Sequence, residues 1–257
     1  MSLIRVRNLR KVYQVGKERV MALNRINLSI EAGEICCILG TSGSGKSTLL
    51  NIMAGLEKPS KGAVLIDGVD VTKLSERKLA AFRQQNIGFV FQSYNLMPGQ
   101  NATENVAMPL MFKGVGKRKR DKEAVRMLKA VGLGKRLTHK PNQMSGGQQQ
   151  RVGIARAFVS RPKIVFADEP TGNLDSKTTR DVMEIIVGMA REHKETLVLV
   201  THDRDIACYA DRIVRIIDGN IDSDEPNESI LPMEKILELK KEKEAARAAA
   251  QGGNKHE

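Results

Sequence analysis

The chain has 257 residues, of which 41% are hydrophobic, and it carries a formal net charge of +12 with only 3 cysteines. Its uninterrupted apolar stretches are far shorter than the roughly 18 residues that span a bilayer, so we expect no transmembrane segment. The first residues alternate apolar and polar side chains instead of forming a secretory signal, so we expect no export.

The positive charge is concentrated in the first part of the chain. Residues 222–257 hold 6 basic and 9 acidic side chains, which leaves the first 221 residues with a net charge of +15. A phosphate-rich ligand, an anionic membrane surface or nucleic acid would each explain such an excess. Only 4% of the residues are aromatic and none is Trp, which disfavours a stacking platform for single-stranded nucleic acid.

Three segments have the pattern of strands with one buried face. Residues 4–7 and 26–30 alternate apolar and polar side chains, which is typical of half-buried antiparallel strands. A third strand is predicted over residues 63–66, ending at the Asp67-Gly68 turn. We therefore expect a small antiparallel β-layer.

Five short runs are almost continuously apolar, which is the pattern of strands buried on both faces of a parallel sheet. They cover residues 35–39, 87–91, 164–167, 197–200 and 213–217. Cys36 and Cys37 lie inside the first run and Cys208 lies far along the chain, a spacing that fits no metal site. We expect reduced thiols.

Helical patterns separate these runs. They cover residues 46–54, 121–131, 148–160 and 178–191. The first two end at Gly55 and Gly132, which are typical helix terminators. The alternation predicts an α/β fold with a doubly wound parallel-sheet core that carries the small β-layer.

Residues 93–147 interrupt this alternation, and we expect an inserted helical subdomain over about residues 93–157. It contains a basic cluster formed by Lys117, Arg118, Lys119 and Arg120. Such a cluster is most often a solvated face. The alternative is contact with anionic lipid.

The composition changes after Gly219, first to Asp, Glu, Ser and Pro and then to Lys, Glu and Ala. We expect one domain over residues 1–221 and a charged tail over residues 222–257 that is partly helical and partly disordered. The predicted tail helix covers residues 234–250 and would be exposed.

A glycine-rich segment follows the apolar run 35–39 and opens the helix that ends at Gly55. It consists of Gly40, Thr41, Ser42, Gly43, Ser44, Gly45, Lys46, Ser47 and Thr48. Glycines let several backbone N–H groups converge on phosphate oxygens, Lys46 supplies a mobile charge, and the Ser47 hydroxyl can bind Mg²⁺. A chance Gly/Ser-rich turn would not explain the flanking strand and helix. The segment predicts nucleotide binding.

Two adjacent acids end the apolar run 164–167, where α/β sheets place ligands. Successive strand residues point to opposite faces, so the two acids are expected to have different tasks. Asp168 suits the magnesium shell, directly or through water, and Glu169 suits polarising an attacking water. We expect Pro170 to hold Glu169 extended. Capping of the next helix is the alternative for this segment alone.

A second helix start also has the features of a phosphate site. Ser145 followed by Gln148 predicts a capping box, with an apolar stripe on the helix behind it. Gly146 and Gly147 directly after the cap leave backbone N–H groups unobstructed. A simple well-capped helix is the alternative.

In this order and spacing, the phosphate loop, the Ser145 segment and the two acids resemble the ATPase domain of ABC transporters, over roughly residues 1–219. The resemblance implies a P-loop NTPase core with an antiparallel β-subdomain and an inserted helical subdomain. In that family two domains face head to tail, and each ATP lies between the phosphate loop of one and the serine-glycine segment of the other. It therefore implies a homodimer in which Ser145, Gly147 and Gln148 act across the interface.

Other positions resemble the family one by one. Tyr13 resembles the aromatic that stacks on adenine, and Gln92 resembles the glutamine that senses magnesium and contacts the membrane partner. Asp175 lies in a segment that resembles the loop between the two ATP sites, and His202 resembles the histidine at the γ-phosphate. With Glu169, His202 and Lys46 as catalytic residues, the implied cofactors are ATP and Mg²⁺.

Several motifs resemble the branch that serves lipoprotein release, macrolide efflux and cell-division permeases. The resemblance implies an integral membrane permease as partner and a peripheral position at the cytoplasmic face. Met144 replaces the usual Leu, and residues 99–101 are more polar than usual for the family.

Two alternatives belong to other functional classes. A soluble ABC ATPase acting on DNA or ribosomes tends to have a long coiled-coil insertion or two ATPase domains, and neither is evident, so no nucleic-acid partner is expected. A small-molecule P-loop kinase would leave the Ser145 segment and His202 without a task.

Overall fold

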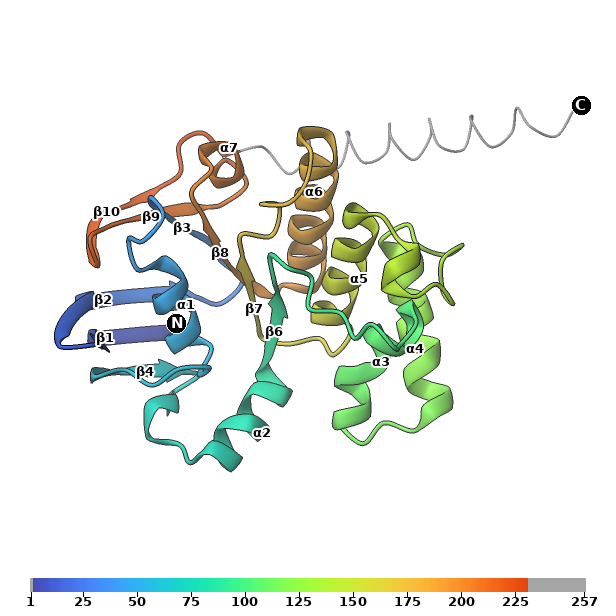
Figure 1. The fold of residues 1–257 in the computed structure, drawn as a ribbon, viewed down its shortest axis with the longest axis horizontal. Helices are drawn as coiled ribbons and strands as arrows, with labels where there is room; N and C mark the ends of the chain where they lie inside the picture. Colours follow the sequence, from blue (N-terminus) through green and yellow to red (C-terminus); the bar gives the residue numbers. More distant parts are fainter. Residues whose placement is uncertain (1, 231–257) are drawn as a thin grey trace, which may run out of the picture.

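The computed structural model describes residues 2–230, and Figure 1 shows their arrangement. The strands are β1 (Ser2–Val15), β2 (Glu18–Glu31), β3 (Ile35–Leu39), β4 (Lys61–Ile66), β5 (Val69–Asp70), β6 (Ile87–Val90), β7 (Ile164–Asp168), β8 (Thr196–Thr201), β9 (Arg212–Ile217) and β10 (Asn220–Pro226). The α-helices are α1 (Lys46–Met53), α2 (Glu76–Asn86), α3 (Ala102–Phe112), α4 (Lys117–Ala130), α5 (Gly146–Phe158), α6 (Ser176–His193) and α7 (Arg204–Ala207). Within residues 2–230, no helix has the length and apolar character needed to cross a bilayer. The helix predicted over residues 234–250 lies outside the described range.

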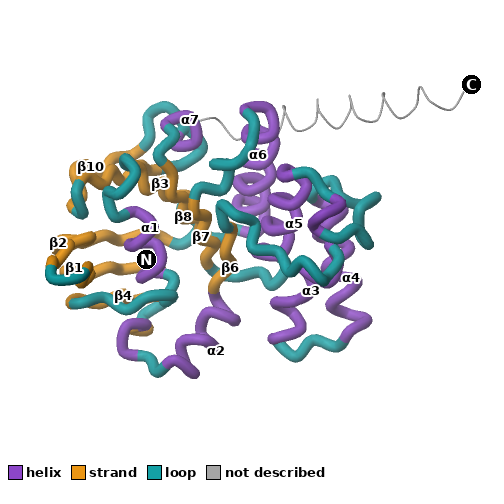
Figure 2. Tube along the Cα trace, in the orientation of Figure 1, coloured by secondary structure: helices purple, strands orange, loops and turns teal. Residues whose placement is uncertain are grey.

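Two sheets form the framework of the molecule, as Figure 2 shows. The larger sheet has the strand order β10-β9-β3-β8-β7-β6, and its neighbours are parallel except for the pair β9 and β10. The smaller sheet has the order β2-β1-β4-β5 and is antiparallel. This topology confirms the predicted parallel core with an antiparallel β-layer.

Strand β3 separates two hydrophobic cores, because its side chains alternate between the two faces of the larger sheet. Ile35, Cys37 and Leu39 belong to the core that includes α5 and α6. Cys36 and Ile38 belong to the core shared with α1 and the smaller sheet. Both cysteines are free and buried, as predicted, and burial raises the pKa of the Cys37 thiol to about 12.

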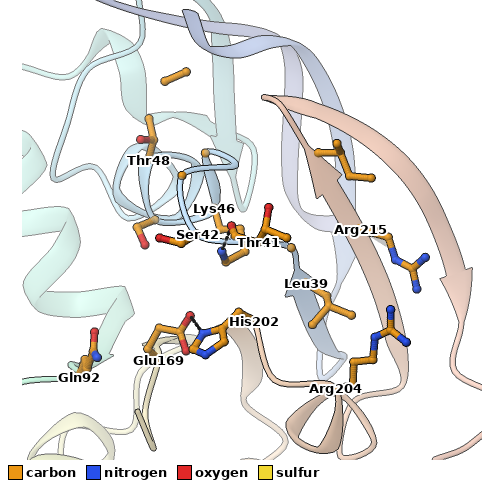
Figure 3. A pocket seen from close by; sticks show the side chains of 16 residues that line it. Leu39, Thr41, Ser42, Lys46, Thr48, Gln92, Glu169, His202, Arg204 and Arg215 are labelled. Carbon is orange, nitrogen blue, oxygen red and sulfur yellow. Dashed lines mark hydrogen bonds and ion pairs between the residues drawn. The ribbon is translucent and has the colours of Figure 1, made fainter. Parts of the chain in front are cut away.

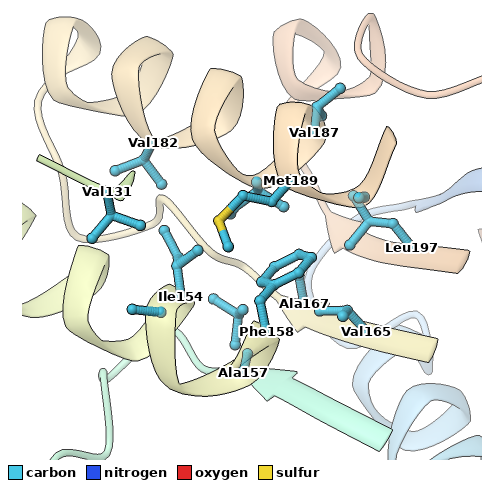
Figure 4. Packing of buried hydrophobic residues seen from close by; sticks show 14 of the residues in the cluster. Val131, Ile154, Ala157, Phe158, Val165, Ala167, Val182, Val187, Met189 and Leu197 are labelled. Carbon is cyan, nitrogen blue, oxygen red and sulfur yellow. The ribbon is translucent and has the colours of Figure 1, made fainter. Parts of the chain in front are cut away.

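Helices α5 and α6 cover one face of the larger sheet (Figure 4). Ile154 and Phe158 of α5 and Val187 of α6 belong to the same buried cluster as Val165 and Leu197 of the sheet. The apolar stripe predicted on α5 is buried, and it consists of Val152, Ala155, Phe158 and Val159. The spacing of these residues therefore identified the face that packs.

The inserted segment folds as helices α3 and α4, which pack on each other and on α5 to one side of the larger sheet (Figure 1). A capping box starts α3: the Asn101 side chain accepts a bond from the Glu104 N–H at 2.9 Å, and the Glu104 carboxylate accepts one from the Asn101 N–H at 2.8 Å. Helix α4 begins at Lys117, earlier than predicted, because Lys and Arg favour helix. The basic cluster is thus the first turn of α4.

Three other features differ from the sequence prediction. Strand β9 is not buried on both faces, because Ile217, beside the edge strand β10, is 46% exposed. Strand β10 was not predicted, and it continues the sheet past residue 221, where the tail was expected to begin. Helix α2 was also not predicted, since Leu79 is its single fully buried residue and the apolar period is weak.

Candidate functional site

The predicted phosphate loop connects β3 to α1 and packs closely against neighbouring backbone. Gly45 has φ of 101°, and a Cβ there would lie 2.4 Å from the carbonyl O of Ala22. A Cβ at Gly40 would lie 2.3 Å from the carbonyl O of Ile216. Neither position accepts a side chain without moving the backbone, so the curvature of the loop depends on these two glycines.

Lys46 opens α1 directly behind the loop. It is 5% exposed, and its Nζ donates to the carbonyl O of Thr41 at 2.7 Å. Burial lowers the pKa of Lys46, and the carboxylates of Glu169 and Asp168 oppose this effect. The ammonium group therefore lies at the loop beside two acids, where a bound phosphate could replace the Thr41 carbonyl as its acceptor.

A cavity of about 820 Å³ opens over the loop, as Figure 3 shows. Its lining consists of Ala22, Leu39, Gly40, Thr41, Ser42, Gly43, Gly45, Lys46, Ser47, Thr48, Gln92, Glu169, His202, Arg204, Arg215 and Ile217. The fold thus brings together residues that the sequence places far apart. A cavity of this size is large enough for a nucleotide.

Ser44 and Tyr13, both predicted to bind the nucleotide, are not part of this lining. Ser44 is 3% exposed, and its Oγ is buried without a hydrogen-bond partner among the described residues. The hydroxyl of Tyr13 donates to Glu57 at 2.8 Å and lies 3.5 Å from Oγ1 of Thr48, which does line the cavity. Tyr13 therefore lies next to a residue that lines the cavity but does not line the cavity itself.

Asp168 and Glu169 contact different groups, but strand alternation is not the reason, because β7 ends at Asp168. The Ser47 hydroxyl donates to Oδ1 of Asp168 at 3.1 Å. Burial raises the pKa of Asp168, and the hydrogen bond from Ser47 opposes this shift. A hydroxyl and a carboxylate side by side are the oxygen ligands that Mg²⁺ prefers, so this pair fits a magnesium ion.

Glu169 has φ of 44°, so the prediction that Pro170 holds it extended is wrong. The backbone turns away from the sheet at Glu169, just after the end of β7, although the Glu169 N–H still donates to the carbonyl O of Val200 in β8 at 2.9 Å. Its Oε1 lies 2.8 Å from Nδ1 of His202, and its Oε2 accepts a bond from Oγ1 of Thr201 at 3.3 Å. The turn thus places Glu169 and His202 in direct contact at the cavity (Figure 3).

Gln92 follows β6 and lines the cavity, whereas Asp175 does not. The backbone O of Gln92 accepts a bond from Nδ2 of Asn173 at 3.1 Å, which links the two segments. Asp175 instead caps α6, since its carboxylate accepts bonds from the N–H and Oγ1 of Thr178 at 2.9 and 2.7 Å. These hydrogen bonds lower the pKa of Asp175.

Ser145 and Gln148 form the predicted capping box at the start of α5. The Ser145 Oγ accepts a bond from the Gln148 N–H at 3.4 Å, and the Gln148 Oε1 accepts one from the Ser145 N–H at 3.2 Å. A Cβ at Gly147 would crowd the Thr178 methyl at 2.5 Å. None of Ser145, Gly147 and Gln148 lines the cavity, so one chain does not bring this cap and its own phosphate loop into one site.

Arg204 and Arg215 line the cavity near Leu39 and were missed from the sequence (Figure 3). Neither guanidinium group has an ion-pair partner among residues 2–230. Their charges make this wall attractive to an anionic ligand. No local pattern marks them, because their position depends on α7 and β9 meeting at the same cavity.

A family model described as "ABC transporter" matches residues 23–172. The chain belongs to the ABC transporter family. The macrolide export ATP-binding/permease protein MacB of Rhodopirellula baltica is 46% identical over 224 residues, which make up 86% of this chain but only 33% of that protein. The lipoprotein-releasing system ATP-binding protein LolD of Geobacter metallireducens is 48% identical over 223 residues, or 87% of this chain and 99% of that protein.

Solved structures of this ABC family include a dimeric, post-hydrolysis state of the ATP-binding cassette MJ0796 of Methanocaldococcus jannaschii bound to ADP and Pi. It has a TM-score of 0.82 and 44% identity, and the match covers 87% of this chain and 98% of that chain. The predicted ABC ATPase fold is confirmed, as is the function of an ATP-binding and ATP-hydrolysing subunit of the ABC transporter type. The names MacB and LolD fit the predicted branch, and neither points to DNA or ribosomes.

Proposed function

We propose that two copies of this ABC ATPase close head to tail on two Mg·ATP and that closure drives a conformational change in an integral membrane permease. The main support for the proposal is that one chain has two elements suited to bind phosphate and that these two elements do not share a site. The phosphate loop opens onto the cavity, whereas the cap at Ser145 does not line it. A second copy would supply the missing cap to each cavity. The dimeric state of the M. jannaschii relative supports this arrangement.

In the proposed closed dimer, the N–H groups of the phosphate loop and the ammonium group of Lys46 bind the phosphates of ATP. Ser47, Asp168 and Gln92 would hold Mg²⁺, which neutralises charge on the transferred phosphoryl group. Ser145 of the second copy closes onto the γ-phosphate, together with its neighbours Gly147 and Gln148. Tyr13 is the proposed contact for the adenine ring.

Glu169 is the group proposed to polarise the attacking water. Its carboxylate lies at the cavity and is oriented by Thr201 and His202. The water oxygen forms a bond to the γ-phosphorus as the bond from that phosphorus to the leaving ADP oxygen breaks, which yields ADP and phosphate. Because Nδ1 of His202 faces Glu169, its Nε2 is the ring atom left for the γ-phosphate.

Replacement of Glu169 by Gln tests this assignment. The amide keeps the size of the side chain but cannot accept the water proton, so we expect turnover to fall by roughly 10³-fold while ATP binding persists. ATP hydrolysis and ATP-dependent dimerisation would be measured together, by phosphate release and size-exclusion chromatography. The matched control is Glu192→Gln, an exposed residue of α6 that does not line the cavity. Near wild-type turnover in Glu169→Gln would show that the assignment is wrong.

An apolar groove supports the proposal of a permease partner. It has a volume of about 580 Å³ and lies between α2, β6 and α3, with Phe89, Phe91, Met108 and Phe112 in its lining. Phe91 directly precedes Gln92, so a helix seated in this groove would act on a segment that also reaches the ATP cavity. We propose a cytoplasmic helix of the permease as the occupant.

The proposed location is therefore the cytoplasmic face of the membrane, with the chain held there by its permease. The names of the relatives suggest the class of work: lipoprotein release, as for LolD, or export, as for MacB, both driven by ATP. A third possible task is the transmission of force to a protein assembly outside the cytoplasm.

A further inference from the structure

The turn between α3 and α4 presents apolar and basic side chains next to each other. Met111 and Phe112, at the end of α3, are 42% and 64% exposed. Lys117, Arg118 and Lys119, in the first turn of α4, are all exposed. We call Met111, Phe112 and residues 117–120 the α3–α4 tip. Exposed large apolar side chains beside a cluster of cations are the composition of a membrane-surface contact.

The cations of the tip are only partly neutralised within the chain. Lys117 pairs with Asp121 at 2.8 Å, and Arg120 lies 3.9 Å from the same carboxylate. Arg118 and Lys119 have no ion-pair partner among residues 2–230. Cations in the first turn oppose the helix dipole, which offsets the favourable helix propensity of Lys and Arg at this position. Arg118 and Lys119 are therefore available to an anionic surface outside the chain.

The tip lies at the rim of the apolar groove proposed for the permease. Phe112 belongs both to the tip and to the lining of that groove. Across the groove, the start of α2 adds Arg77, which also lines it, and Lys78, both exposed. Figure 1 shows the α3–α4 turn and α2 at the same edge of the molecule. Cations therefore flank the groove on both sides.

We propose that the α3–α4 tip binds the anionic lipid headgroups of a bilayer beside the groove. The proposal rests on the proposed function in one respect, since a permease in the groove would orient this edge toward the membrane. The cations of the tip favour binding to anionic headgroups. The exposed side chains of Met111 and Phe112 favour a partner that has an apolar layer beneath its charged surface. A nucleic acid would leave these two side chains exposed to water.

Vesicle co-sedimentation of the full chain tests the proposal. We expect binding to vesicles of phosphatidylcholine mixed with phosphatidylglycerol, no binding to phosphatidylcholine alone, and weaker binding at high salt. The double variant Arg118→Gln/Lys119→Gln should bind the mixed vesicles roughly tenfold more weakly, and Met111→Ser, at a tip residue outside the groove lining, should also weaken binding. The matched control is Lys129→Gln/Lys135→Gln, which removes two exposed cations from the other end of α4 and the loop after it, neither with an ion-pair partner in the described part of the chain.

Equal weakening in this control would overturn the proposal, because it would mean that total charge, and not the tip, determines binding. Unchanged vesicle binding in Arg118→Gln/Lys119→Gln would overturn it as well. Tip-dependent binding to duplex DNA without vesicle binding would replace it with a nucleic-acid contact. None of these residues lines the ATP cavity, so ATP turnover should stay at the wild-type value in every variant. Failure of the proposed function would appear instead as lost turnover or lost ATP-dependent dimerisation in the unmodified chain.

Discussion

Glu195 is a buried carboxyl group without a hydrogen-bond partner. It is 4% exposed, and neither carboxylate oxygen has a partner among the described residues. It lies in a small cavity between α6 and β8, together with Arg161, Lys163 and His193. Burial raises the pKa of Glu195 to about 8, and the charge of Arg161 only partly opposes this. The folded chain therefore holds Glu195 protonated at neutral pH.

This group should make stability depend on pH. The usual pKa of the carboxyl is 4.5 and its value in the folded chain is about 8, so its contribution to stability is complete below pH 4.5 and is lost as pH rises to about 8. Glu195→Gln cannot ionise, so its free energy of unfolding should rise by a few kcal/mol relative to that of the wild type as pH increases from 4.5 to about 8. Urea unfolding of both proteins at several pH values measures the difference. A difference that does not change with pH would contradict the burial of this carboxyl group.

At the scale of single elements, α5 connects the cap at Ser145 to the hydrolytic site. Gln150 is fully buried, and its Nε2 donates to the backbone O of Phe91 at 3.4 Å and to that of Pro170. Phe91 precedes Gln92, and Pro170 follows Glu169. We therefore expect a movement of α5 to be transmitted to both segments.

Gln150→Leu tests this connection, because it preserves the approximate volume and removes both hydrogen bonds. We expect ATP turnover to fall by roughly tenfold and stability to fall by about 1–3 kcal/mol, since two carbonyl groups lose their donor. The control is Gln149→Leu, because among residues 2–230 the Gln149 side chain donates only to the carbonyl O of Met144. Steady-state hydrolysis and urea unfolding separate the two effects. If Gln150→Leu lost stability but kept full turnover, Gln150 would contribute to packing only, and the proposed connection would be wrong.

Strong local patterns identified most elements but not all of them. The apolar runs at β3 and β7 and the loop before α1 were predicted because hydrophobicity and glycine spacing mark them directly. The acidic strand β10 was missed, since its pairing with β9 comes from main-chain bonds that its side chains do not reveal. The positive φ of Glu169 was also missed, because the following Pro170 favours an extended backbone at that position.

At the scale of the whole molecule, the proposed site is assembled from two chains, and mixing tests this. Lys46→Ala removes the phosphate-binding charge but leaves the Ser145 cap intact, while Ser145→Arg blocks the cap but leaves the phosphate loop intact. Each variant alone should be inactive. Their mixture should regain hydrolysis, because a mixed dimer contains one site with an intact loop and an intact cap.

Phosphate release by the mixture, titrated at constant total protein, measures the recovery. The control is a mixture of Lys46→Ala with a Lys46→Ala/Ser145→Arg double variant, in which no site has an intact loop. Hydrolysis that stays at the level of this control would contradict a site shared between chains.

The left-handed backbone of Glu169 also determines which substitutions stabilise the protein. A non-glycine residue in that conformation costs about 1–2 kcal/mol. Glu169→Gly should therefore be more stable than Glu169→Ala by about 1 kcal/mol, the reverse of the usual order, and thermal unfolding of the two variants measures the difference. Equal stabilities would show that the turn is not strained. Stability alone would favour glycine at this position, so, with the role proposed for Glu169, the carboxylate serves hydrolysis at a cost in stability.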